Sequence, residues 1–429
     1  VDVLALGMMS ALQKCLDDLS KHQNKPFLMQ DIPQEDDPKV YEMLCQADSV
    51  GLFQVESRAQ MNMLPRLKPK TFYDLVVQVA IVRPGPIHGD MVHPYLKRKH
   101  GKEKIHVPLK SMEPILRRTF GVPIFQEQVI AIAMMAADFS ADEAEQLRRS
   151  MASWKKQGHM SRFQKKLHTN LYKKGVSVQY IEQLQKQIEG FGEYGFPESH
   201  AASFALLAYY SAWMKYYYPA VFTAALLNSQ PMGFYPPWQL IQNAKRHGVT
   251  VHPIEINRSE WQHVAEIKSN SLQLGFQLIK GFNKESAEQI TLNRPESGYT
   301  SIQDVINRNN LSQIDLDKLA ASHCFKTFHG NRYANQWKVN SHDLYSGLFS
   351  ELAPDSDLEP ETNRMDEFLR DYESTGVMLH DHPMAYLRDQ GRLNDCVTAE
   401  GLKDLTHESE TYVAGVITNR QRPKTSAGV

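Results

Sequence analysis

The sequence predicts a mainly α protein with minor β structure, divided among several domains. Its 429 residues exceed the length of one typical domain. Between residues 120 and 226 most apolar side chains recur at helical spacing. The alternation typical of strands is confined to short pieces, such as residues 249–256 and 272–279.

The first predicted helices are bounded by turn residues. Acidic residues at 35–37 precede a short helix over residues 39–47, where they suit the first turn. The segment VGLFQVESRAQMNMLPRLKP predicts a helix that ends at Pro65 and Pro69. Thr71 is the expected N-cap of the helix that runs to AIVRPGP.

The middle of the chain predicts helices over residues 126–136, 141–150, 159–174 and 178–189, and again after His200. The apolar run after His200 is broken by Lys215 and Pro219. It is therefore expected to form buried helices and not a membrane span.

The C-terminal third predicts short helices over residues 299–325 and then a linker. Residues 351–373 carry nine acidic and two basic side chains, as expected of a solvated segment that grades into a helix. Residues 411–423 alternate like the first strand of a β-barrel.

Overall composition indicates an ordinary globular protein and excludes several function classes. The formal net charge is −1, so no global charge excess points to nucleic acid or membrane. The four cysteines lie far apart without a CxxC pair, which argues against a zinc or redox site and predicts a reducing, cytoplasmic location. The histidines are scattered without ligand spacing, which argues against a metal hydrolase. The opening VDVLALGMMSAL lacks the basic start of a signal peptide.

A basic segment lies within this neutral chain. Residues 92–175 contain seventeen Lys or Arg and seven Asp or Glu. These basic residues could simply lie on solvated helix faces without binding anything. However, the number of Lys and Arg clusters in one segment favours a phosphate-binding surface. Arg148 and Arg149 point about 100° apart on a helix, which suits two neighbouring phosphate groups.

The stretch FGEYGFPESHAASFALL places His200 at the mouth of a predicted apolar helix. A histidine there is consistent with a catalytic base, a metal ligand, a phosphate contact or a capping residue. Arg83 precedes the rigid turn Pro84-Gly85-Pro86, which either places Arg83 near a partner or serves only the fold.

Four motifs together resemble the fingers region of C-family bacterial DNA polymerases. They are VAIVRPGPIHGDMVHPYLKRKHG (79–101), GVPIFQEQV (121–129), QLRRSM (146–151) and GFGEYGFPESHAASFALLAYYSAWMKYYYPAVFTAALL (190–227). The amino-acid sequences of these motifs are most similar to those of the error-prone paralogue of the DNA polymerase III α subunit. The resemblance covers nearly the whole chain.

This resemblance implies a multidomain polymerase fragment with a definite domain order. The expected parts are the end of a palm (1–8), a helical fingers domain (9–258), tandem helix-hairpin-helix units (259–345), an acidic linker and connecting segment (346–405), and the beginning of an OB-fold (406–429).

The activity implied is translesion addition of dNTPs to a primer 3′ end by two Mg²⁺ ions. Asp2, in VDVLALG, aligns with the third catalytic, metal-binding carboxylate of the family, and the other two would lie upstream. The fragment alone is therefore expected to bind nucleotide and DNA without polymerising. The alternative is a non-catalytic DNA-binding scaffold derived from the same family.

The resemblance also implies roles for basic and glycine positions. The nucleotide-binding positions are Arg83, Arg148, Arg149, Lys155, Lys156 and His200, the last through phosphate contact. The primer-template DNA-binding positions are Lys97, Arg98, Lys99, Gly281 and Lys284. Residues Tyr345–Phe349 (YSGLF) are a weak match to a sliding-clamp peptide, and other translesion accessory proteins are possible partners.

Two positions depart from the helix-hairpin-helix pattern. Asn283 and His323 stand where the family commonly has glycine. Asn283 is expected to keep the hairpin turn because asparagine tolerates the left-handed region. The bulk of His323 argues against a tight phosphate approach at the second hairpin.

Overall fold

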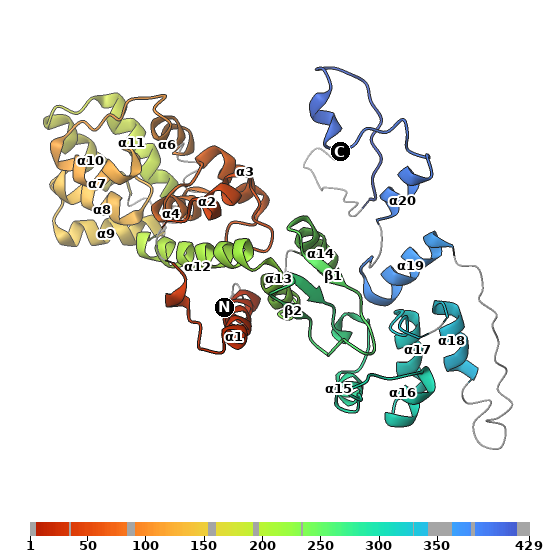
Figure 1. Ribbon diagram of the computed structural model, residues 1–429. Coiled ribbons are helices and arrows are strands. Elements are labelled where there is room, and N and C mark those ends of the chain that lie inside the picture. The colour runs from red at the N-terminus through yellow and green to blue at the C-terminus, as the bar shows by residue number, and fades with distance from the viewer. Residues whose placement is uncertain are drawn as a thin grey trace. The chain divides into compact units, whose positions relative to one another are not determined.

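The computed structural model describes residues 6–33, 36–83, 91–152, 160–191, 197–232, 235–328, 330–341, 363–378 and 382–417, and it confirms the mainly α class with minor β structure (Figure 1). The chain forms two compact units. Unit 1 contains residues 1–235, 243–249 and 267–270, and unit 2 contains residues 236–242, 250–266 and 271–429.

Unit 1 is helical. Its α-helices are α1 (Leu6–Gln23), α2 (Pro38–Cys45), α3 (Arg58–Leu67), α4 (Phe72–Ile81), α6 (Val92–Lys99), α7 (Glu113–Leu116), α8 (Gln126–Met135), α9 (Ala141–Ala152), α10 (Met160–Lys173), α11 (Val178–Phe191), α12 (Glu198–Tyr217) and α13 (Pro219–Leu227). Short 3₁₀ turns are η1 (Met29–Asp31), η2 (Lys110–Met112) and η3 (Arg117–Thr119). Helix α14 (Pro237–Arg246) contributes residues to both units. Throughout the described ranges, no helix has the length and hydropathy to cross a bilayer.

Unit 2 combines a small sheet with short helices. Its elements are β1 (Thr250–His252), β2 (Val264–Glu266), β3 (Ser271–Gln273), η5 (Phe276–Leu278), α15 (Lys284–Leu292), α16 (Ile302–Arg308), α17 (Gln313–Ala321), α18 (Arg332–Ser341), α19 (Arg364–Thr375), α20 (Pro383–Asp389) and η8 (Gly401–Asp404). The predicted barrel strand at 411–423 shows an isolated bridge between Cys396 and Tyr412 in its described part.

Local capping explains where the early helices begin and end. The Thr71 side chain accepts a bond from the Asp74 N–H, which confirms the predicted N-cap of α4. The prediction that α3 ends at Pro65 is wrong, because the helix continues to Leu67. Pro65 lies in the last turn, and the next N–H bond, from Lys68 to the Leu64 carbonyl, forms at 2.9 Å. Lys68 then ends the helix in the left-handed conformation, with φ 51°.

The core of unit 1 is organised by α12, which packs against α4, α2 and α13 (Figure 1). Ala201, Ala205, Ala208 and Ala212 recur at helical spacing and are at most 1% exposed. These small side chains allow the neighbouring helices to approach closely. The apolar run after His200 is therefore a buried core helix, as predicted.

The C-terminal half of α12 contains a buried cation. Lys215 is 2% exposed and donates to Asp48 Oδ1 at 2.7 Å and to the Val50 carbonyl at 3.1 Å. His247 Nε2 lies 2.5 Å from Asp48 Oδ2. Burial alone would raise the pKa of Asp48, but the bonds from His247 and Lys215 hold it at about 2. Asp48 therefore stays ionised as the counter-ion.

The sheet of unit 2 has the order β1-β3-β2, with β1 parallel and β2 antiparallel to β3. The predicted strand over 272–279 is wrong beyond Gln273, because residues 276–278 form η5. A Cβ on Gly275 would lie 2.4 Å from the Gln262 backbone. Only glycine fits this close backbone approach, and the chain turns there out of the sheet.

A buried charge cluster joins α18 to α19 in unit 2. Arg332 and Asp371 are both fully buried and form an ion pair. Arg332 Nε also lies 3.2 Å from Glu367 Oε2 and donates to His323 Nδ1 at 3.3 Å. A buried guanidinium is tolerated only with such partners, so the cluster fixes these helices together.

Asp371→Ala should loosen α17, α18 and α19 because it removes a buried partner of Arg332. The expected loss is about 3 kcal/mol, equivalent to roughly a hundredfold faster hydrogen exchange in these helices. Hydrogen–deuterium exchange with mass spectrometry measures this directly. The control Glu373→Ala changes an exposed residue of α19 and should leave exchange unchanged. Equal exchange in both variants would contradict a structural role for the pair.

Glu56→Gln should stabilise unit 1 at pH 8 and have little effect near pH 4. Burial raises the pKa of Glu56 from its ordinary value near 4.5 to about 7. Ionisation is therefore harder in the folded state, and wild-type stability falls as pH rises through this window. The gain at pH 8 should be about 2–3 kcal/mol, measured by chemical unfolding at several pH values. Glu42→Gln, at an exposed position of α2, should show no such pH dependence.

Candidate nucleic-acid interface

The three basic residues at the end of α6 have different environments. Lys97 is exposed. The Arg98 side chain is 9% exposed and donates to Glu103 at 2.8 Å and to the carbonyls of Phe120 and Gly121 at 3.3 Å. Lys99 forms an ion pair with Asp74, whose side chain also caps α4. The charges of Arg98 and Lys99 thus already have partners within unit 1, whereas Lys97 faces solvent.

In α9, the two neighbouring arginines share one carboxylate. Arg148 donates to Glu145 at 2.7 and 2.8 Å, and Arg149 Nε donates to Glu145 Oε1 at 3.0 Å. The side chains of Arg148 and Arg149 are 45% and 75% exposed. The bonds from Arg148 and Arg149 lower the pKa of Glu145 to about 2, so Glu145 remains ionised at neutral pH. One anion therefore orients two exposed guanidinium groups.

The N-terminus of α12 is bonded to distant parts of unit 1. The Glu198 N–H donates to Glu127 Oε2 at 3.0 Å. Glu198 Oε1 accepts a bond from the Tyr73 hydroxyl at 3.0 Å and lies 3.4 Å from Arg118. The Arg118 guanidinium stacks over the Tyr73 ring at 3.9 Å. The first N–H of α12 is therefore already bonded, because the Glu127 carboxylate accepts from Glu198.

His200 itself is exposed on the first turn of α12. Its ring meets Phe204 edge-on, with 4.3 Å between ring centroids, and Phe204 stacks on Phe53. Packing against Phe204 orients the imidazole while leaving it accessible. His200 remains a predicted phosphate contact.

Two side chains of the FQEQV motif have structural partners in unit 1. Gln128 is buried and accepts bonds from the N–H groups of Ile124 and Phe125 at 2.8 and 3.1 Å. Its amide donates to the Ile115 carbonyl at 2.9 Å. Gln128 thus serves the local fold, and Glu127 caps α12. Arg83 is a further predicted nucleotide contact. Its Nε lies 3.4 Å from the Val79 carbonyl.

The first hairpin of unit 2 retains a left-handed glycine. Gly281 has φ +69°, and its carbonyl accepts a bond from Lys318. Asn283 does not adopt the expected left-handed conformation, since its φ is −85°. It is the N-cap of α15 instead, accepting a bond from the Glu285 N–H at 3.0 Å. Lys284 is 60% exposed and lies 3.4 Å from Glu288.

The second hairpin places His323 in the left-handed region, with φ 61°. Its side chain is 16% exposed, lies 3.7 Å from Glu367 and contacts Arg332. The histidine therefore takes the backbone conformation usual for glycine while its ring joins the buried cluster. The second hairpin does not present the small residue that a close phosphate approach favours.

The sequence did not predict two groups of residues that the fold brings together. Arg66, Lys68 and Lys102 lie with Lys97 around one cavity, although Arg66 and Lys68 precede the basic segment. Tyr73 and Arg118 meet at the start of α12, far from it in sequence. For Arg66 and Lys68, the sequence feature that could have indicated this site is the stretch PRLKP, in which prolines flank two basic residues.

Several predicted positions lie outside the described residues. They are Asp2, Lys155, Lys156 and the clamp-like segment 345–349. Within the described ranges, no group of three or more His, Cys, Asp or Glu side chains could hold a metal ion. The assignment of Asp2 to a Mg²⁺ site therefore stays a prediction.

Two regions of the chain match known protein families. Residues 8–175 match the bacterial DNA polymerase III alpha subunit finger domain, and residues 248–335 match a helix-hairpin-helix motif. The whole chain aligns with the error-prone DNA polymerases of Hahella chejuensis, at 57% identity, and Vibrio parahaemolyticus, at 50% identity. The chain spans 42% of the length of each of these relatives. Over its whole length the chain is therefore similar to one part of the error-prone DNA polymerases, and within it lie a region similar to the DNA polymerase III alpha subunit finger domain and a helix-hairpin-helix motif.

Proposed function

We propose that the chain is the nucleotide- and DNA-binding part of an error-prone DNA-directed DNA polymerase. The observation that carries this proposal is the continuous similarity of all 429 residues to relatives named error-prone DNA polymerase. The proposed enzyme adds dNTPs to a primer 3′ end, acts in translesion synthesis and the response to DNA damage, and works in the cytoplasm.

The exposed pair on α9 suits the triphosphate of an incoming nucleotide. The two guanidinium groups share a single carboxylate, so the pair keeps a net positive charge, and planar guanidinium donors match phosphate oxygens better than a point charge does. Glu145 holds both side chains in place, so less conformational entropy is lost on binding. Lys155, Lys156, Arg83 and His200 are further proposed contacts to the nucleotide.

Primer-template DNA is the proposed macromolecular partner. Lys97 and Lys284 offer exposed charges for backbone phosphates, and Gly281 allows the first hairpin to approach a strand. A sliding clamp at residues 345–349 and other accessory proteins are further proposed partners.

Mg²⁺ belongs to the proposal through Asp2. The bound ions would neutralise charge on the reacting phosphates, and Asp2 would supply one carboxylate among several that two ions need. The residues of this chain then bind and orient the nucleotide and the template strand.

Asp2→Asn, made in the full-length polymerase that carries this segment, should lower primer extension at least about a hundredfold, because the amide is a poorer metal ligand. Gel-resolved extension in Mg²⁺ measures the rate. Asp17→Asn, at an exposed position of α1, is the matched control and should extend normally. If the wild-type protein binds primer-template DNA but extends nothing, a non-catalytic scaffold is the correct description.

Arg148→Ala combined with Arg149→Ala should raise the KM for dNTP about tenfold or more and change the Kd for primer-template much less. The physical reason is the loss of two charge-assisted contacts to the triphosphate. Steady-state extension and fluorescence anisotropy give the two constants for the same protein. Lys21→Ala with Lys25→Ala removes two exposed charges as the control. Equal losses of nucleotide and DNA affinity would assign the two arginines to the DNA backbone.

A further inference from the structure

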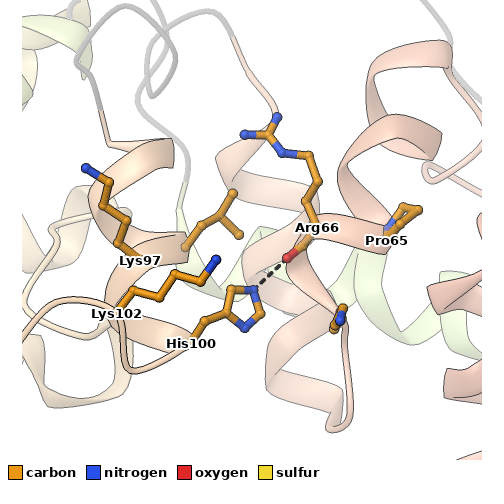
Figure 2. Close-up of a pocket in the computed structure, with 7 residues that line it drawn as sticks. Pro65, Arg66, Lys97, His100 and Lys102 are labelled. Carbon is orange, nitrogen blue, oxygen red and sulfur yellow. Dashed lines mark hydrogen bonds between the residues drawn. The ribbon is translucent and has the colours of Figure 1, made fainter. Parts of the chain in front are cut away.

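A cavity of about 450 Å³ opens between the end of α3 and the end of α6. Figure 2 shows Arg66 on the α3 side and Lys97, His100 and Lys102 on the α6 side. Lys68 and the apolar side chains of Leu96 and Pro65 complete the lining. Among the described residues that line this cavity there is no carboxylate and no Phe, Tyr or Trp ring.

Backbone contacts fix the shape of this cavity. His100 Nε2 lies 2.7 Å from the Arg66 carbonyl oxygen, which ties the turn after α6 to the end of α3 (Figure 2). The Lys102 N–H donates to the Lys97 carbonyl at 2.8 Å, and Gly101 between them has φ +69°. This is a helix-ending turn that places Lys97 and Lys102 close together. The backbone is held, while the charged side-chain ends are exposed.

Among the described residues, the four charged side chains of the cavity have no carboxylate as counter-ion. Within the described part of the chain, no ion pair joins Arg66, Lys68, Lys97 or Lys102 to a carboxylate. The adjacent Arg98 and Lys99 each have one. The C-termini of α3 and α6 stabilise nearby cations through the partial negative charge of their last carbonyl groups. The helix dipoles alone do not explain why four cations surround one cavity. The cations repel one another there, and a bound anion would relieve this repulsion.

We infer that this cavity binds the phosphodiester backbone of DNA. The inference rests on the proposed function and joins Arg66 and Lys68, which lie outside the basic segment, to Lys97 and Lys102 within it. Exposed charges beside the apolar Leu96 and Pro65 match a sugar-phosphate strand, which is bound through charge and shape without reading sequence. The His100 ring is bonded to the Arg66 carbonyl, and no Phe, Tyr or Trp lies among the described lining residues, so the cavity offers no broad surface for a stacked base, which argues against a free nucleotide.

The test is a triple variant, Arg66→Gln, Lys68→Gln and Lys102→Gln, all at exposed positions. Fluorescence anisotropy of the 429-residue chain with labelled primer-template DNA is measured from 50 to 400 mM salt. Each lost phosphate contact should reduce the slope of log K against log salt by about 1, and the affinity in 0.1 M salt by about eightfold. Lys21→Gln, Lys25→Gln and Lys39→Gln remove equal charge from exposed positions and should change neither quantity.

The outcomes separate this inference from the proposed function. An unchanged affinity and salt slope in the triple variant, with wild-type binding intact, would overturn the cavity site alone. Absence of DNA binding by the wild-type chain would overturn the proposed function as well. A weakened affinity for dNTP with unchanged DNA binding would identify a nucleotide site and reject the backbone assignment. The single variant Lys102→Glu provides a second test in an exposed turn, and it should weaken DNA binding more than Lys102→Gln does.

Discussion

The ion pair between Lys215 and Asp48 is the constraint on which the arrangement of unit 1 depends. Lys215 lies in the core, where a charge without a partner would be several kcal/mol unfavourable. The chain at residues 48–50 must therefore meet α12 at that point, and His247 adds a second contact to the same carboxylate. Because a helix is stiff, fixing this end of α12 also fixes the other end. Glu198 and His200 are thereby held where Tyr73, Arg118 and Glu127 converge.

The structure also changes the meaning of the positive charge in residues 92–175. Counting residues suggests a uniformly basic surface, yet several of these cations are neutralised locally. Lys166 pairs with Glu143 at 2.6 Å, Lys174 with Asp138 at 2.7 Å, and Lys99 with Asp74. What remains for a partner is a smaller set at particular places. Electrostatic binding depends on this remaining set, so charge in a sequence becomes informative about ligands only after internal pairs are subtracted.

Features that depend on neighbouring residues, such as helix caps, could be predicted from the sequence. Contacts between residues far apart in the chain could not. The Thr71 cap and the buried helix after His200 follow from neighbouring residues, and both were predicted correctly. The end of α3 was missed because a proline in the last turn removes only one helical bond. The strand at 272–279 was overextended because the approach of Gly275 to Gln262 depends on chain folding. The cluster at the start of α12 was missed for the same reason, since Tyr73 and Glu198 are 125 residues apart.

The two hairpins of unit 2 form left-handed turns with different residues, Gly281 and His323. A left-handed backbone costs a non-glycine residue about 1–2 kcal/mol, and His323 accepts it while its ring packs beside Arg332 and Glu367. The buried cluster thus offsets the strain, but the small residue at the hairpin surface is lost. The first hairpin keeps Gly281, and Lys318 bonds its carbonyl and brings a cation to the same turn. Of the two hairpins, the first therefore keeps the feature that the proposed backbone–phosphate contact requires, a left-handed glycine with the Lys318 cation bonded to its carbonyl.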